Sequence, residues 1–525
     1  MDCKKIPLTD TKSFSPFFLD YISNTNTLQP FYNRFPLIEN FEAQFEEKSA
    51  SFPDSNRSVL VEVLKKQYKD LEISKAVSSN IESLSDKKTF TITTGHQLNI
   101  FTGPLYFIYK IVTVINACKK LKKAYPENDF IPVYWMASED HDYEEIKYFN
   151  LYGHKHIWET DQKGAVGRFD TKSLAKLAKE IPGDVSIFNQ AYSKNSTLAN
   201  AVRHYINALF GDQGLIVMDA DDRQLKTLFK NAIHDDLFNH AAKKAVDLTN
   251  HQLHQLGYHT QVNAREINHF FLDSNLRGRI ERTVSGFSVV DTDLTFTEEE
   301  VVKMIEATPE KFSPNVILRP LYQETILPNL AYTGGPAELV YWLQLKGVFE
   351  HFNIPFPILL PRNFAMVMDY PSVRKFSKTG LQLSDLFEEK NFLFNHWVIN
   401  NTHHTLSVGK ELKEIQDIFN ALGERASKID STLTPMISAQ LKKATNSLEK
   451  IEHKLLKAEK RLHSDKLGQV EALKNALFPK GSLQERTDNF LTFYQPDNQF
   501  INTLLAQFDP FDFQFNVLMY DKTGA

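Results

Sequence analysis

The chain has 525 residues, of which 42% are hydrophobic and 24% charged, with 20 glycines and 22 prolines. This size and composition are typical of a large globular protein and exclude a small binding module, a disordered chain and a collagen-like one. The net charge of −5 provides no overall basic field, so we expect neither nucleic acid nor a membrane as a partner. Only Cys3 and Cys118 are present and the N-terminus has no apolar signal core, which together predict a cytoplasmic protein without a disulfide framework.

Two strand–loop units follow a helical lead-in over residues 1–85. TFTITT at 89–94 predicts a strand that ends in a loop at TGHQ, and a helix of about 20 residues is expected from Pro104. FIPVYWM at 130–136 predicts a second buried strand, followed by SEDHD. Because a strand–helix–strand crossover makes the strands parallel, both loops should meet at the carboxyl edge of one sheet.

The same α/β pattern continues along the chain. A third strand is predicted over 214–222, an antiparallel insertion with a Ser-Gly turn over 258–296, a helix over 336–351 and a strand over 356–361. These elements predict an α/β core within residues 1–384, with inserted segments at approximately 150–205 and 240–315.

Heptad patterning replaces the α/β pattern in the region 385–480. Apolar residues recur every three or four positions over 412–433 and again over 437–462, and Thr434-Pro435 between them suits a helix start. The second helix would continue to about residue 477 and be roughly 65 Å long, with a slip of register after Leu462. We therefore expect a projecting antiparallel coiled-coil hairpin, after which residues 481–525 return to the core.

Two loops at the expected sheet edge carry side chains that could do chemistry. TTGHQLNIFTGP offers His96 and Gln97 and a helix start whose free amides could hold an anion. SEDHD places Asp140, His141 and Asp142 at the edge where open α/β sheets bind ligands. A purely structural turn and a solvated acidic loop are the alternative interpretations of these two segments.

A second glycine-rich helix start occurs in AYTGGPAELVYW. Gly334 and Gly335 allow close approach of the backbone and Pro336 fits the first helical turn, although an ordinary helix start also has these features. Three arginines are candidate anion clamps or, alternatively, members of ordinary ion pairs: Arg319, Arg362 and Arg486. No HExxH or CxxC motif accompanies SEDHD, so we predict no tightly held metal.

The glycine-rich loop and the blocks that follow it carry a resemblance. TTGHQLNIFTGPLYFIYKI is similar to the TGQQ-x-x-x-x-TGPLY-x-x-x-K signature of the bacillithiol-biosynthesis cysteine-adding enzyme family, with His96 where the family commonly has Gln. The likeness continues through PVYWMASEDHDYEEI, LRPLYQETILPNLAYTGGPAELVYW, FPILLPRNFAMVMD and FPKGSLQERTDNF. It implies a Rossmann-like core similar to that of class I aminoacyl-tRNA synthetases, interrupted by connecting insertions, and a coiled coil that joins two subunits into a homodimer.

The reaction of that family is the addition of L-cysteine to glucosaminyl-malate, which gives bacillithiol. The resemblance therefore implies a ligase that forms an amide bond, with ATP (or ADP) as the bound nucleotide because the cysteine carboxyl must be activated. On this hypothesis, the nucleotide-binding residues are Gly95, Gln97, Thr102, Gly103, Gly334, Gly335 and Arg362, and the catalytic residues are His96, Asp140, His141 and Asp142. Two alternatives remain open: a metal-dependent hydrolase that acts on a sugar amide, and a non-catalytic nucleotide-binding scaffold.

Overall fold

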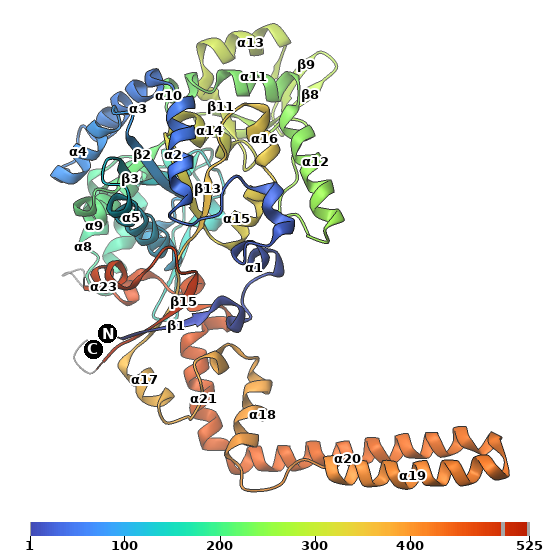
Figure 1. Cartoon of the computed structure of the whole chain (residues 1–525). Helices are drawn as coiled ribbons and strands as arrows, with labels where there is room; N and C mark the ends of the chain where they lie inside the picture. The colour runs from blue at the N-terminus through green and yellow to red at the C-terminus, as the bar shows by residue number, and fades with distance from the viewer. Residues whose placement is uncertain (1, 495–498, 522–525) are drawn as a thin grey trace.

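The structure is a computed structural model that describes residues 2–494 and 499–521. Figure 1 shows a rounded body, a stalk of helices beneath it and a long helical hairpin that projects from the stalk. Among the described residues, no helix combines the length and the apolar character needed to cross a bilayer.

A five-stranded parallel sheet lies at the centre of the body. Its strands in spatial order are β13 (Ile358–Pro361), β12 (Asn329–Gly334), β2 (Thr89–His96), β3 (Asp129–Met136) and β6 (Ile216–Asp219). Numbered along the chain and read from β6, this is the order 3-2-1-4-5 of a Rossmann-like sheet. The direction of winding reverses between β2 and β12, and such folds bind ligands at the carboxyl ends of the strands at this point.

Four of these strands lie where the sequence predicted strands, but β12 was not predicted. All six of its residues are buried, so its sequence NLAYTG shows no alternation between apolar and polar positions. The Gly-Gly-Pro at its end also favours a loop rather than a strand. Its position in the sheet follows only from its pairing with β2 and β13.

Helices cover both faces of the sheet. Helix α5 (Tyr106–Ala124) connects β2 to β3, whereas α15 (Pro336–Leu343) and α16 (Lys346–His351) connect β12 to β13. Because right-handed crossovers that progress in opposite directions place their helices on opposite faces, α5 and α15 flank the sheet (Figure 1). The single helix predicted over 336–351 is wrong: it is interrupted at Gln344, whose buried amide binds the backbone of residues 261–262.

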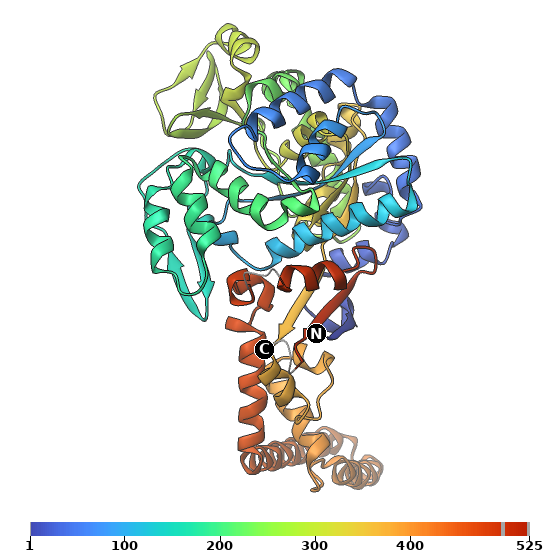
Figure 2. The same cartoon turned by 90° about the vertical axis from the view of Figure 1, so that its left-hand side faces the viewer.

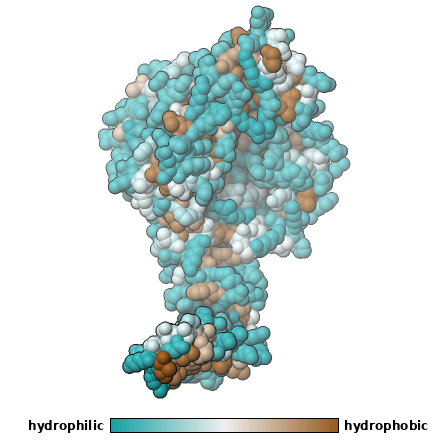
Figure 3. Space-filling model, turned by 90° about the vertical axis from the view of Figure 1, so that its right-hand side faces the viewer, coloured by the Kyte–Doolittle hydropathy of each residue, from teal (hydrophilic) through white to brown (hydrophobic). Residues whose placement is uncertain are grey.

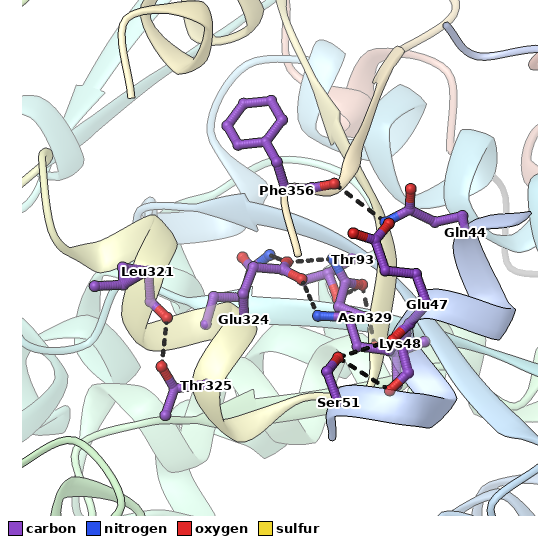
Figure 4. A network of polar contacts seen from close by, with 12 residues as sticks. Gln44, Glu47, Lys48, Ser51, Thr93, Leu321, Glu324, Thr325, Asn329 and Phe356 are labelled. Atoms are coloured by element: carbon purple, nitrogen blue, oxygen red, sulfur yellow. Dashed lines mark hydrogen bonds and ion pairs between the residues drawn. The ribbon is translucent and has the colours of Figure 1, made fainter. Parts of the chain in front are cut away.

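The N-terminal region packs against this core. Its helices are α1 (Pro16–Ile22), α2 (Asn40–Ser51), α3 (Asp54–Gln67) and α4 (Lys75–Ser83). A buried ion pair fastens it, since Lys48 Nζ of α2 lies 2.9 Å from Glu324 Oε2 (Figure 4). Asn329 donates to the same carboxylate and accepts from Thr93 on β2, which places this network at the amino end of the sheet.

Two inserted segments interrupt the core; Figure 2 shows the teal helices of the first at the left of the body and the yellow-green antiparallel strands of the second above them. The segment between β3 and β6 contains α6 (Tyr143–Ile146), β4 (Tyr148–Leu151), β5 (His154–Ile157), α7 (Lys172–Leu177), α8 (Ser186–Lys194) and α9 (Leu198–Phe210). The segment between β6 and β12 contains α10 (Arg223–Thr227), α11 (Lys230–Phe238), α12 (Ala241–Gln255), β7 (His269–Asp273), β8 (Leu276–Thr283), β9 (Gly286–Val289), β10 (Thr295–Phe296), α13 (Glu298–Ala307), β11 (Phe312–Pro314) and α14 (Arg319–Ile326). The antiparallel insertion predicted within it is confirmed, because β8 pairs antiparallel with both β7 and β9.

The chain then leaves the body and returns to it. Strand β14 (Phe364–Met368) runs parallel to β15 (Gln514–Met519), which pairs antiparallel with β1 (Asp2–Pro7), so the two ends of the chain lie together (Figure 1). The helices that follow β14 are α17 (Tyr370–Phe376), α18 (Lys390–Asn401), α19 (Gly409–Ile429), α20 (Thr434–Leu462), α21 (Ser464–Leu477), α22 (Gln484–Thr487) and α23 (Gln499–Gln507).

Helices α19 and α20 form the projecting antiparallel hairpin that the heptads predict (Figure 1). The prediction of one continuous helix through to residue 477 is wrong, because the helix breaks at His463, where φ is −101° and ψ is 18°. Beyond the break, α21 turns toward the body and buries Leu467 and Val470. The break coincides with the slip of heptad register after Leu462.

Candidate active site

A cavity of about 620 Å³ opens at the carboxyl ends of β2, β3 and β12. It lies at the point where the strand order reverses, and α14 and α15 both begin on its wall. Six of the residues predicted to form the site line it: Gly95, His96, Gln97, Asp140, Gly335 and Arg362. The two loops expected to meet at this edge therefore do so, together with the second glycine-rich helix start.

The remaining predicted residues lie outside the lining of this cavity. Gly103 lines a second, adjoining cavity of about 330 Å³, where its φ of +60° and its contact with Asn99 leave no room for a side chain. Thr102 is buried beside it. A Cβ at Gly334 would come within 2.9 Å of Leu339, so the backbone of Gly334 packs closely against the core rather than against a ligand in the cavity. His141 and Asp142 lie in the acidic loop, where the His141 side chain contacts Arg277 and Asp142 caps a short helix.

A partly buried charge pair forms the floor of the cavity. Lys110 Nζ on α5 donates to the carbonyl oxygen of Gly95 at 2.8 Å and lies 2.6 Å from Glu338 Oε2. The Glu338 carboxylate also accepts from the Tyr332 hydroxyl at 3.0 Å and from the Gly335 N–H at 2.7 Å. These bonds hold the ends of β2 and β12 and the start of α15 as one unit.

The Lys110 side chain is 1% exposed and the Glu338 side chain 28%, so the ammonium group is buried and the carboxylate lies at the cavity surface. Burial lowers the pKa of Lys110, whereas the Glu338 charge opposes that shift. Burial alone would raise the pKa of Glu338, but the Lys110 ammonium and the Gly335 N–H hold it below its usual value. Sequence reasoning did not select Lys110, although a lysine within the apolar helix LYFIYKIVTVINAC is a recognisable signal of a buried partner.

Three nitrogen atoms of lining residues are buried without a hydrogen-bond partner among the described residues: His96 Nε2, Arg319 Nη2 and Arg362 Nε. The Arg319 guanidinium lies over the Tyr332 ring at 5.3 Å, and Arg362 pairs through its Nη2 with Glu485. Unpaired buried donors are rare and indicate a missing ligand, ion or water. Two guanidinium groups beside a helix start favour a phosphate or carboxylate group.

His96 is neutral at physiological pH. Burial, followed by the charge of Lys110, lowers its pKa to about 3. Its ring stacks on Phe107 with 5.0 Å between the ring centroids. A histidine with this pKa is a weak base, so its chemical capacity here is to donate or accept a hydrogen bond rather than to remove a proton.

Because the pKa of His96 is lowered in the folded protein, the free energy of unfolding should depend on pH in the acidic range. Below about pH 6.5 the unfolded chain binds a proton at this side chain, whereas the folded chain remains unprotonated until about pH 3. Stability is therefore lost as the pH falls below 6.5. In His96→Gln, the free energy of unfolding measured with urea should fall less between about pH 7.5 and about pH 5 than in the unaltered protein. An equal fall in both proteins would show that His96 titrates normally in the folded state.

The opposite wall of the cavity is acidic. Asp140 accepts hydrogen bonds from Gln97 Nε2 at 3.1 Å, from the His141 N–H at 2.7 Å and from Arg277 Nη1 at 3.4 Å. Glu139 pairs with Lys226, and burial raises its pKa to about 6. Arg277 comes from β8 in the inserted sheet, and no local sequence signal pointed to it.

The other two side chains of the acidic loop do not line the cavity. Asp142 caps α6, since its Oδ1 accepts from the Glu145 N–H at 3.2 Å. His141 Nδ1 lies 2.8 Å from Arg277 Nη1, and burial followed by the Arg277 charge lowers the pKa of His141. Within residues 2–494 and 499–521, no three His, Cys, Asp or Glu side chains gather closely enough to hold a metal ion.

Two family models together match almost the whole chain. Residues 1–363 match the N-terminal Rossmann-like domain of the bacillithiol biosynthesis protein BshC, and residues 365–520 match its C-terminal coiled-coil domain. The chain belongs to the BshC family. The resemblance found in the sequence is confirmed, as are the Rossmann-like α/β core and the separate coiled-coil domain of the BshC fold.

Relatives of similar length carry the same family name. The chain is 43% identical over 519 residues to a "Putative cysteine ligase BshC" of Flavobacterium psychrophilum, with 97% of both chains covered. Proteins of the same name from Flavobacterium johnsoniae and Cytophaga hutchinsonii are 42% and 40% identical over 516 and 518 residues, with at least 96% of each chain covered. These names support a role in bacillithiol biosynthesis and do not favour the hydrolase or scaffold alternatives.

Proposed function

We propose that the protein is an ATP-dependent ligase that joins the carboxyl group of L-cysteine to the amino group of glucosaminyl-malate, the last step of bacillithiol biosynthesis. The observation that supports this proposal is the charge distribution of the large cavity. Arg319 and Arg362, each with one unpaired buried nitrogen, lie beside the start of α15 and form a pole that suits phosphate, and the Asp140 carboxylate on the opposite wall suits an ammonium group. The nucleotide and both amino-bearing substrates therefore match the cavity in charge.

The reaction requires activation of a carboxyl group before the amide bond can form. The cysteine carboxylate attacks the α-phosphorus of ATP, which gives an acyl-adenylate and releases pyrophosphate, or the γ-phosphorus, which gives an acyl phosphate and releases ADP. The phosphates of ATP would lie against Arg319 and Arg362. The sugar amine then attacks the activated carbonyl carbon, the new C–N bond forms, and the C–O bond to AMP or phosphate breaks. The proton lost by the amine goes to a carboxylate on the acidic wall, of which Asp140 is the proposed acceptor.

The decisive experiment is direct. The purified protein is incubated with ATP, L-cysteine and glucosaminyl-malate, and the products are separated and weighed by mass spectrometry. Bacillithiol formed together with AMP supports adenylate activation, and bacillithiol formed with ADP supports an acyl phosphate. Consumption of glucosaminyl-malate without incorporation of cysteine would contradict the proposal and favour a hydrolase.

Replacing single aspartates of SEDHD should show that turnover depends on Asp140, which lines the cavity, and not on its neighbour Asp142. Asp140→Asn keeps the size and the hydrogen bond from Gln97 but removes the charge, so turnover should fall by about 10²-fold or more with ATP affinity retained. Asp142→Asn is the matched control, because asparagine also caps helices and the residue lies outside the cavity. Near-normal turnover in both variants would leave the acidic loop without a catalytic role.

We further propose that the hairpin joins two copies of the chain. Helix α19 has no buried residue, and it exposes Ile418 and Ile429 to 58% and 82%, respectively. Figure 3 shows hydrophobic surface gathered at the end of the hairpin. A second hairpin packed on this surface would remove these side chains from water, which is the usual driving force for coiled-coil association.

The double variant Ile418→Glu, Ile429→Glu should convert a dimer into a monomer, because it places charges in the proposed interface without disturbing a buried core. Light scattering coupled to size-exclusion chromatography measures the mass. Gln416→Glu, which adds charge at an exposed polar position of the same helix, is the control and should remain dimeric. A double variant of unchanged dimeric mass would place the interface elsewhere.

A further inference from the structure

The second cavity adjoins the first and shares part of its wall. Both cavities are lined by Gln97, Tyr106, Glu145 and Arg486. The second cavity, of about 330 Å³, lies between the loop after β2, strand β4 and helix α22. A molecule bound there would reach the large cavity across this shared boundary.

The segment that carries Arg486 is fastened on both sides of that residue. Gln484 exchanges two hydrogen bonds with the backbone of Val367 on β14, and the buried Glu485 accepts from the Ala365 N–H at 3.0 Å and pairs with Arg362. On the other side, Asn489 Nδ2 donates to the carbonyl oxygens of residues 101 and 103. The backbone position of Arg486 is therefore set by its neighbours.

Arg486 itself takes no part in this anchoring. Its side chain is exposed, and no hydrogen bond or ion pair joins its guanidinium to any residue in the described part of the chain. A cation held at a cavity wall by a rigid segment loses little backbone freedom when it binds an anion. A guanidinium group is suited to bind a carboxylate through two parallel hydrogen bonds.

Asn99 adds a hydrogen-bond acceptor to the second cavity. The side chain is only 8% exposed, and its Nδ2 donates to the Glu145 carbonyl oxygen at 3.0 Å. Its Oδ1 is buried and has no partner among the described residues. Such an oxygen requires a donor, and a sugar hydroxyl is one.

We propose that the second cavity binds the acceptor substrate, a carboxylate-bearing glycoside of an amino sugar, with Arg486 pairing with its carboxylate and Asn99 accepting from a sugar hydroxyl. This inference rests on the proposed ligase function. It divides the reaction between two cavities, with the nucleotide and cysteine in the larger one. The acceptor amine then crosses the boundary beside Glu145 to reach the activated carboxyl.

The test compares the steady-state kinetics of Arg486→Met with those of Arg265→Met. Arg265 is a matched control, since it is exposed, lines neither cavity, and its guanidinium makes no hydrogen bond or ion pair with another described residue. Arg486→Met should raise the KM for glucosaminyl-malate about tenfold to a hundredfold and leave the KM values for ATP and cysteine unchanged. Arg486→Lys, which keeps the charge but not the planar fork, should lie in between. A KM for glucosaminyl-malate unaffected by Arg486→Met would overturn the proposal.

A separate measurement distinguishes failure of this inference from failure of the proposed function. L-malate is titrated calorimetrically into the unaltered protein and into Arg486→Met without ATP. If no bacillithiol forms under any condition but malate binds only the unaltered protein, the ligase proposal fails and the carboxylate site at Arg486 stands. If bacillithiol forms and malate binds both proteins equally, the ligase proposal stands and the role of Arg486 falls.

Discussion

Replacing Lys110 by methionine is expected to abolish ligation even in protein that remains folded. The substitution leaves the Glu338 carboxylate, which is 28% exposed on the cavity floor, without its cation. Breaking a fully buried pair costs about 3 to 5 kcal/mol of stability, so the loss here should be at the low end of that range or below it. It also removes the bond from Lys110 to the Gly95 carbonyl oxygen, which fixes the end of β2 beside His96. Activity should fall at least about 100-fold in assays of bacillithiol formation at a temperature where the variant is folded.

A fully buried Lys–Glu pair elsewhere in the core provides the control. Lys48 and Glu324 lie at the amino end of the sheet, away from the cavity, and their side chains are 1% and 0% exposed (Figure 4). Lys48→Met should therefore lose at least as much stability in urea unfolding as Lys110→Met but retain turnover in the folded fraction. Equal loss of activity in the two variants would mean that stability alone, rather than the position of the charge pair, limits turnover.

The double variant Lys110→Met, Glu338→Gln sharpens the comparison. Removal of both charges eliminates the unpaired carboxylate, so much of the lost stability should return. Activity should not return, since the Gly95 carbonyl oxygen and the start of α15 would still lack the lysine. Recovery of both properties would assign the pair a purely structural role.

Gly335→Glu is expected to lower the affinity for ATP by on the order of a hundredfold or more. A Cβ at Gly335 would lie 3.7 Å from Arg362 Nε and 3.3 Å from Glu338 Oε2. The added carboxylate would therefore occupy the space beside Arg362 in which we place a phosphate, and it would repel the nucleotide. Isothermal calorimetry measures the effect.

Two further glycine variants make the result interpretable. Gly335 has φ −77° and ψ 172°, which any residue can adopt, so Gly335→Ala should fold and show a smaller loss of affinity. Gly468→Glu places the same charge where no atom lies within 4 Å and should bind ATP normally. Unaltered affinity in Gly335→Glu would move the phosphate site away from the start of α15.

The sequence anticipated those parts of the site that lie at the ends of predicted strands. His96, Gln97 and Asp140 follow two strands joined by one helix, and parallel strands bring such ends to one edge. Residues from distant segments could not be placed in this way. Arg277 lies 137 residues beyond Asp140, and Glu485 lies 123 residues beyond Arg362, and neither pairing has a local signal.

The acidic loop shows the limit of such reasoning within a few residues. SEDHD indicated that several ionisable groups gather at the sheet edge, and they do. Which of them face the cavity depends on the turn that follows β3, because Asp142 is used to cap α6 while Asp140 is held by Gln97 and Arg277. The direction in which a side chain points cannot be predicted from composition and spacing.

The sequence by itself determined three things about this protein. The buried strands and glycine-rich loops determined that the core is α/β and that the two loops meet at the carboxyl edge of the sheet. The heptads determined the helical hairpin. These features depend on periodicity and turn chemistry over a few residues, which act locally. The tertiary structure alone decided that β12 lies between β2 and β13, that the long helix breaks at His463, and that Lys110 and Glu338 share the cavity floor. Each of these results from pairing or burial between segments far apart in the chain, where packing outweighs local preference.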